Sequence, residues 1–123
     1  MRILIFGCAC ILFLASCISS KKCIEGKDLI GNYKSISEPD LHSVEIKSDG
    51  RFIHTYKDTD TTLINNGVWS FNQKKCSIML SNWKSYGKYK ENDCLKGCSY
   101  TVDVKQETLV FNFDLEEMNF KKE

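Results

Sequence analysis

The feature that most constrains the fold is a run of alternating apolar and polar residues interrupted by the dipeptide Asp49-Gly50. Successive side chains of a β-strand point to opposite faces, so this alternation predicts strands at 43–48 and 51–57. An Asp-Gly pair between such runs indicates a hairpin, because both positions of a two-residue turn need a positive φ. The inward face would carry the side chains of Val44, Ile46, Phe52, His54 and Tyr56, and the outward face those of Glu45, Lys47, Arg51, Thr55 and Lys57.

Shorter runs of the same kind recur along the chain. Further strands are expected at 29–36, 68–71, 76–80, 100–105 and 109–113. Polar or turn-forming residues separate them, at Pro39, 58–61, 73–75 and Gln106-Glu107. Residues 115–120 are expected to form a last strand or a helical turn, with Phe120 packed at the rim of the fold.

Short strands at nearly even spacing, without a long helical period, predict an all-β fold built as a small antiparallel up-and-down meander. An open sheet would leave two edges unpaired, so we expect the meander to close into a barrel. The interior of a barrel this small can be filled by side chains. We expect that role for Trp69, Phe71, Phe111 and Phe113.

The first sixteen residues are typical of a signal peptide. Arg2 precedes an apolar run at 3–14, and the polar residues Ser19, Ser20, Lys21 and Lys22 follow closely. A transmembrane helix needs about 20 apolar residues, so a permanent span is not expected. We predict that residues 1–16 are removed.

The tetrapeptide Leu14-Ala15-Ser16-Cys17 at the end of this run resembles the bacterial lipobox. The resemblance implies a lipid thioether on Cys17 and two or three fatty chains, enough for stable anchoring to a membrane. Because Ile18 rather than Asp follows, it also implies the outer membrane of a Gram-negative bacterium. The alternatives are the outer leaflet of a bacterium with one membrane, and an ordinary secretory signal that matches by chance.

Cleavage would leave 107 of the 123 residues, which suits one domain. We divide them into a lipidated tether at 17–27 and a barrel at 28–123, and we expect a monomer. Without Arg2 the chain has 16 basic and 16 acidic residues, so no overall field would attract nucleic acid or an anionic membrane.

The chain also resembles the small lipocalin-like barrels found among bacterial lipoproteins. The resemblance lies in 29–33, similar to an opening Gly-x-Trp/Tyr signature, in the hairpin at 49–52 and in Gly67-Val68-Trp69. It covers most of the mature chain. It implies a lipocalin-like β-barrel.

Four cysteines remain besides Cys17, namely Cys23, Cys76, Cys94 and Cys98. An even number in an exported protein predicts two disulfides, for which three pairings are possible. Bonded Cα atoms lie about 4.4 to 6.8 Å apart and four strand steps span roughly 13 Å, so Cys94 with Cys98 requires a turn. We favour the pairing of Cys98 with Cys76 and of Cys94 with Cys23.

The cysteines, His42 and His54 include the usual soft metal ligands, but their spacing matches no zinc motif. We therefore expect neither a metal nor a cofactor. His54, on the inward face, is expected to be a satisfied core or rim residue, or else a group that orients a ligand at the barrel mouth. His42 is expected in a loop.

Motifs for catalysis are missing from the sequence, which has no Gly-x-Ser-x-Gly elbow, His-Glu-x-x-His helix or phosphate loop. The carboxylates Asp114, Glu116 and Glu117 are expected to be solvated charges. We therefore expect no enzyme. Convergence of His54 with a carboxylate and a hydroxyl would instead favour a minor hydrolase.

The segment 81–92 is expected to be a loop and is the best candidate for an interaction site. It combines aromatic rings with amines, which suit sugar rings or an acidic protein surface. The candidate residues are Trp83, Lys84, Tyr86, Lys88 and Tyr89, with Lys74, Lys75 and Lys90 nearby. In the alternative, Trp83 and one tyrosine cap the barrel and the lysines are only solvated.

Together these observations predict a lipid-anchored, non-enzymatic envelope protein that binds an apolar ligand inside the barrel or a protein or glycan partner at its rim. The alternative is an inhibitor or immunity protein that blocks an envelope-attacking enzyme through 81–92. A large apolar cavity would favour a ligand, and a filled barrel would favour a partner.

Overall fold

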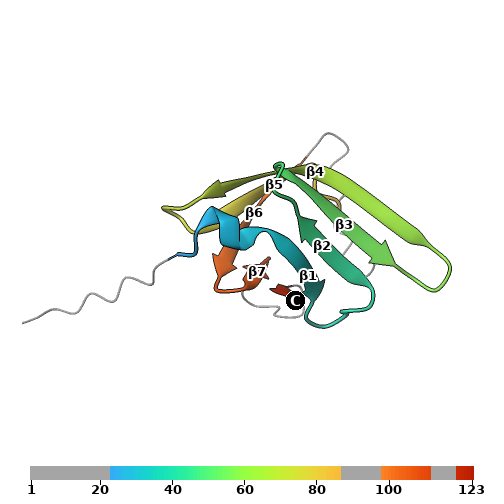
Figure 1. Cartoon of the computed structure of the whole chain (residues 1–123). Helices are drawn as coiled ribbons and strands as arrows, with labels where there is room; N and C mark the ends of the chain where they lie inside the picture. Colours follow the sequence, from blue (N-terminus) through green and yellow to red (C-terminus); the bar gives the residue numbers. More distant parts are fainter. Residues whose placement is uncertain (1–22, 87–97, 112–118) are drawn as a thin grey trace, which may run out of the picture.

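The computed structural model describes residues 23–86, 98–111 and 119–123 of the chain (Figure 1). These residues form a closed, entirely antiparallel barrel of eight strands. In chain order the elements are the 3-10 helix η1 (Gly26–Leu29) and the strands β1 (Gly31–Ser35), β2 (His42–Ile46), β3 (Arg51–Lys57), β4 (Thr62–Asn72), β5 (Ser77–Ser81), β6 (Ser99–Lys105), β7 (Thr108–Val110) and β8 (Phe120–Lys122).

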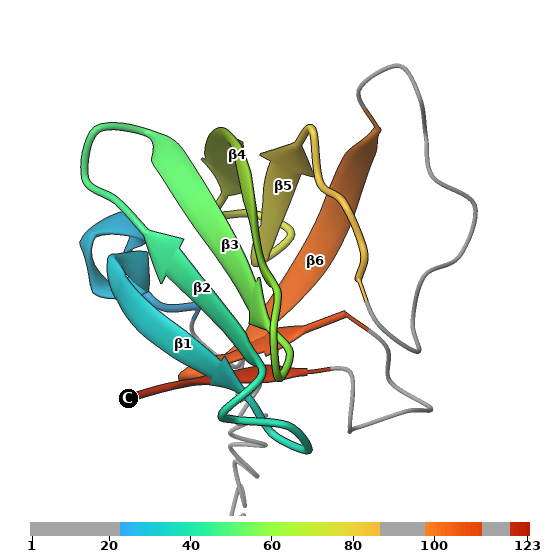
Figure 2. The ribbon, with the colours of Figure 1, turned by 90° about the vertical axis from the view of Figure 1, so that its right-hand side faces the viewer.

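Each strand pairs with the next one in sequence, and β1 pairs with β8 to close the barrel. Figure 2 shows β1 to β6 following one another in this order. The closing register places Tyr33 opposite Lys122 and Ser35 opposite Phe120. The predicted all-β meander and its closure are confirmed. Residues 112–118, which include Phe113, Asp114, Leu115, Glu116 and Glu117, lie outside the described residues.

The central hairpin forms where the alternation predicts it, but with a different turn. The inward side chains of Val44, Ile46, Phe52 and His54 are buried, and Tyr56 is half-buried. The turn contains three residues, 48–50, because the Lys47 amide donates to the Arg51 carbonyl oxygen at 2.9 Å. Of these three turn residues, only Gly50 has a positive φ, of 85°. This geometry is that of a turn followed by a bulge at glycine, not of the expected two-residue turn.

Strand β4 is longer than its sequence pattern indicates. It begins at Thr62 rather than Val68 and runs through Asn66-Gly67. Gly67 lies opposite Phe52 on β3, and a Cβ atom there would collide with the Phe52 ring and with the Ser81 carbonyl oxygen. Glycine at this position therefore lets the Phe52 ring approach the strand closely.

The inward faces of the strands form one core. Its buried members are Leu29, Tyr33, Val44, Ile46, Phe52, Ile78, Leu80, Trp83, Val102, Val104, Leu109 and Phe120. Trp69, Phe71 and Phe111, three of the four predicted filling residues, are only partly buried and pack against this cluster. The buried tryptophan of the cluster is Trp83, which follows β5.

The barrel has two different ends. One end holds η1 and the turns 47–50, 73–76 and 106–107, and we call it the closed end. There Leu29 is fully buried, and its carbonyl oxygen accepts a hydrogen bond from the Tyr33 hydroxyl at 2.7 Å. We call open end the opposite one, with the connections 36–41 and 58–61 and the residues 82–86. Figure 1 shows η1 and the β4–β5 turn at one end and the β3–β4 connection at the other.

A disulfide joins Cys23 to Cys76, with Cα atoms 5.5 Å apart. The pairing that we favoured, Cys76 with Cys98 and Cys23 with Cys94, is therefore wrong. The reason is the antiparallel register: Ser77 lies opposite Asp103 and Ser81 opposite Ser99. Cys76 and Cys98 thus stand at opposite ends of the β5–β6 pair. Cys98 is itself disulfide-bonded, and Cys94 lies outside the described residues.

Candidate functional site

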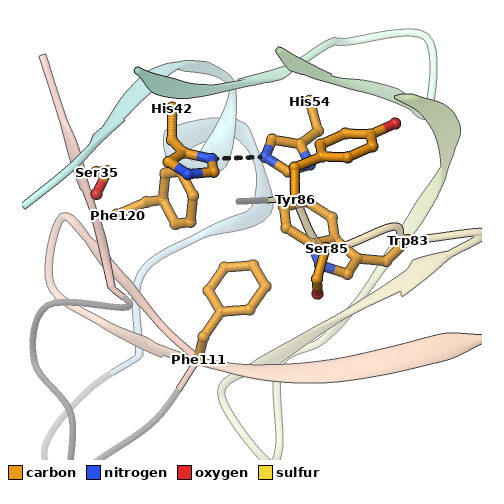
Figure 3. A pocket seen from close by; sticks show the side chains of 8 residues that line it. All are labelled: Ser35, His42, His54, Trp83, Ser85, Tyr86, Phe111 and Phe120. Atoms are coloured by element: carbon orange, nitrogen blue, oxygen red, sulfur yellow. Dashed lines mark hydrogen bonds between the residues drawn. The ribbon is translucent and has the colours of Figure 1, made fainter. Parts of the chain in front are cut away.

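A small pocket enters the barrel at its open end (Figure 3). It is lined by Ser35, His42, His54, Trp83, Ser85, Tyr86, Phe111 and Phe120. Its volume is about 40 Å³, room for a few water molecules, whereas a pocket for a drug-sized ligand has roughly 300 to 1,000 Å³.

Trp83 makes this pocket small. The side chain is 6% exposed, and its ring stacks on that of His54 with centroids 4.2 Å apart and planes within 7°. The ring of Phe111 lies on it at 4.8 Å, and that of Phe52 at 5.7 Å. Trp83 therefore plugs the barrel mouth from within. This position agrees with the alternative from the sequence, in which Trp83 caps the barrel instead of binding a partner.

Asn65 holds the segment that carries Trp83. Its side chain, 3% exposed, points inward from β4. Its amide nitrogen donates to the Asn82 carbonyl oxygen at 2.8 Å, and its amide oxygen accepts from the Lys84 backbone at 2.9 Å. One side chain thus binds the backbone on both sides of Trp83. The chain turns inward at Asn82, whose φ is 63° and whose side chain donates to the Asn66 carbonyl oxygen.

Two buried histidines line the other wall of the pocket. His42 is the first residue of β2 and 5% exposed, so the expectation that it belongs to a loop is wrong. His54 on β3 is 1% exposed. His42 Nδ1 and His54 Nε2 are 3.4 Å apart, and His54 Nδ1 lies 3.1 Å from the Lys84 carbonyl oxygen (Figure 3 shows the two rings facing each other).

The hydrogen-bond partners assign the protons of this pair. A carbonyl oxygen only accepts, so His54 Nδ1 carries hydrogen and donates to Lys84. Burial, and secondly the nearby His42, lower the pKa of His54 from 6.5 to about 3, so the ring is neutral at pH 7. Its Nε2 then accepts from His42 Nδ1. The remaining nitrogen of His42, Nε2, lies 3.5 Å from Glu38 Oε2.

This arrangement does not equip His54 for acid–base catalysis in the state described. A carboxylate and a hydroxyl do come near the histidines, because Glu38 Oε2 lies 3.5 Å from His42 Nε2 and Ser35 lines the same pocket. Both nitrogens of His54, however, already have partners, and its pKa is far below that of an efficient base at neutral pH. The histidines instead attach the segment 83–86 to the wall formed by β2 and β3.

The other interaction candidates are spread over the open end. Lys84 is exposed, and its ammonium group is available to solvent. Tyr86 is half-buried, with its ring 5.3 Å from that of His54 and 6.0 Å from that of Tyr56. Lys88, Tyr89 and Lys90 lie outside the described residues, as does Cys17. Lys74 and Lys75 are at the closed end, far from the rest of the proposed interaction stretch.

A comparison with protein-family models, with curated proteins and with solved structures found no match. Within 23–86, 98–111 and 119–123, no cluster of three or more metal-binding side chains occurs. The same residues contain no helix long and apolar enough to cross a membrane.

The sequence did not reveal the most consequential residues of the site, Asn65 and His42. Asn65-Asn66 interrupts the apolar pattern of β4, and an amide at an inward position signals a buried partner. His42 continues the alternation of Val44 and Ile46 by one step. That step could have placed it on the inward face.

Proposed function

We propose that this protein is a lipid-anchored, non-enzymatic lipoprotein of the bacterial envelope that acts by binding a partner at the open end of its barrel. The likeness of Leu14-Ala15-Ser16-Cys17 to the lipobox supports the anchor on Cys17. The eight-stranded antiparallel barrel supports the resemblance to lipocalin-like lipoproteins. Localisation at the outer membrane of a Gram-negative bacterium belongs to the same proposal.

The observation that carries the partner-binding part is the filled interior. The pocket inside the barrel has about 40 Å³, far below the volume of a carrier site. Opening it would require the withdrawal of Trp83, which the side chain of Asn65 and the stacked ring of His54 oppose. A barrel of this kind is a rigid scaffold for loops rather than a container.

A second function that the geometry favours is that of an inhibitor or immunity protein directed at an envelope-attacking enzyme. Such proteins must present a stiff loop, because ordering a loop on binding costs affinity. The base of 81–92 is fixed by the buried ring of Trp83 and by the two hydrogen bonds of Asn65. A minor hydrolase is the weakest alternative, because both nitrogens of His54 are engaged.

The test is affinity capture from a bacterial envelope extract with the acylated protein. The loop variant Lys84→Glu/Lys88→Glu changes charge without touching the plug, unlike a substitution of Trp83. The matched control Lys105→Glu/Lys121→Glu makes the same change of charge at two exposed lysines that flank Thr108, toward the closed end. We expect a specific protein or glycan to be captured by the wild type and the control and lost from the loop variant. Equal capture by all three would contradict the assigned surface.

Capture of a small apolar molecule, found by extracting the purified protein with organic solvent, would contradict the partner-binding proposal itself. We expect no stoichiometric small molecule in the extract, because fatty chains bound covalently to Cys17 stay with the protein. A stoichiometric free lipid or other apolar compound would show that the barrel opens further than the structure indicates.

A further inference from the structure

The disulfide at the closed end joins two copies of the same tripeptide. Lys21-Lys22-Cys23 and Lys74-Lys75-Cys76 each place two lysines directly before a bridged cysteine. Since consecutive Cα atoms are about 3.8 Å apart, every one of these lysines is tied within two residues of one disulfide. Of these four lysines, Lys74 and Lys75 belong to the described residues.

Lys74 and Lys75 are exposed in the β4–β5 turn. Among the described residues neither takes part in an ion pair, whereas Lys27 and Arg51, also at the closed end, contact Glu25 and Asp49. The surface beside the two lysines is hollowed into an open depression of about 690 Å³. The half-exposed Met79 contributes apolar surface to it. Free amines next to a shallow, partly apolar hollow suit an amphiphilic anion.

The disulfide also limits how far this end can stand from a lipid anchor. Cys17 and Cys23 are six residues apart, so an extended chain between them spans at most about 20 Å. Strand β4 alone, with eleven residues, extends roughly 36 Å towards the open end. An anchor at Cys17 would therefore keep the closed end near the bilayer, while the open end can point away.

We infer that Lys74 and Lys75, beside the Cys23–Cys76 disulfide, form a docking surface for the anionic head groups of a phospholipid bilayer. The barrel then stands on the membrane by its closed end and presents the open end outward. This inference rests on the proposed lipid anchor and adds to it an orientation. Each lysine close to an anionic surface contributes about a fivefold preference for the bound arrangement, and salt weakens that contribution.

The test uses the full acylated protein in vesicles of phosphatidylcholine, with or without phosphatidylglycerol, and a membrane-impermeant reagent that acylates free amines. Mass spectrometry of the peptides gives the reactivity of each lysine. In vesicles with phosphatidylglycerol we expect Lys74 and Lys75 to react at least about fivefold more slowly than without it, and high salt to remove the difference. Lys57 and Lys84, at the open end, should react equally in both vesicles.

A charge variant tests the orientation without removing the disulfide. Lys27, also at the closed end, should be protected by phosphatidylglycerol in the wild type and should lose this protection several-fold in Lys74→Glu/Lys75→Glu. The control Lys57→Glu/Lys84→Glu, with the same change of charge at the open end, should keep it. A near-ultraviolet circular dichroism spectrum like that of the wild type would show that each variant is folded.

The outcomes separate this inference from the proposed function. Acylated Cys17 together with equal lysine reactivity at both ends, or with protection of Lys57 and Lys84, would overturn the docking surface alone. Protection of Lys74 and Lys75 by envelope proteins but not by lipid would overturn it as well. An unmodified Cys17 would overturn the proposed anchor, whatever the lysines show.

Discussion

At the scale of single residues, Asn65 shows how one buried amide can determine the shape of a site. Its two hydrogen bonds satisfy backbone groups on both sides of Trp83. A buried polar group that loses its partner costs about 1 to 3 kcal/mol. The position of the plug therefore depends on a side chain that the hydrophobic pattern alone would treat as an irregularity.

Substitution of Asn65 by alanine should lower the free energy of unfolding by about 2 kcal/mol, because the Lys84 amide and the Asn82 carbonyl lose their partner. Urea denaturation followed by tryptophan fluorescence measures this. The neighbouring substitution Asn66→Ala is the control, since that side chain is exposed on the outer face. Equal effects of the two substitutions would contradict the role given to Asn65.

The depressed pKa of His54 predicts how stability depends on pH. The folded ring stays neutral down to about pH 3, whereas the unfolded ring binds a proton below about pH 6.5. Between these values the unfolded state holds more protons, so stability falls as the pH falls. The His54 contribution is complete above about pH 6.5 and decreases by up to about 1.4 kcal/mol for each pH unit below it.

The variant His54→Gln isolates this contribution, because its amide can still donate to the Lys84 carbonyl oxygen but does not titrate. From about pH 6.5 to about pH 5, above the range of most carboxylates, the wild type should lose about 1 to 2 kcal/mol more than the variant. Unfolding curves at several pH values give both slopes. Parallel slopes would mean that His54 takes up a proton without unfolding.

At the scale of elements, β4 shows what close packing between strands requires. Gly67 leaves room for the Phe52 ring, and a methyl group there would meet both this ring and the Ser81 carbonyl oxygen. We expect Gly67→Ala to destabilise the fold by about 3 kcal/mol, at the upper end of overpacking effects. In the control Gly26→Ala the added Cβ would lie 3.5 Å from Phe71, an ordinary contact, so little change is expected in the urea midpoint. A tolerated Gly67→Ala would contradict this packing.

The sequence alone predicted those elements whose conformation is determined by neighbouring residues. Alternation placed β2 and β3 and gave the inward face that includes His54, and the need for glycine marked the turn at Gly50. It was insufficient where distant segments decide the outcome. Trp83 belongs by pattern to an exposed loop, yet Asn65, eighteen positions earlier, holds it inside the barrel.

The cysteine pairing is an intermediate case, because topology would have decided it. In an antiparallel meander the start of β5 lies beside the end of β6, so Cys76 and Cys98 are separated by the length of the strand pair. Applying the predicted meander to the cysteines would have excluded their bond. The partner of Cys76 is instead Cys23, which precedes η1 at the same end of the barrel.

At the scale of the whole molecule, the two ends of the barrel divide the proposed functions. The closed end holds the Cys23–Cys76 disulfide, the exposed Lys74 and Lys75, and the segment nearest to the proposed anchor. The open end holds the plugged pocket and the exposed Lys84. This division suits a protein that is fixed to a membrane at one end and meets a partner at the other.

The claim on which this account depends is that Cys17 becomes a lipidated amino terminus. The most direct measurement is mass spectrometry of the protein purified from a bacterial envelope, intact and after digestion. We predict a first peptide that begins at Cys17 and carries a diacylglycerol group, with or without a further acyl chain. A peptide that begins at Cys17 without lipid, or an intact chain that retains Met1, would contradict the account.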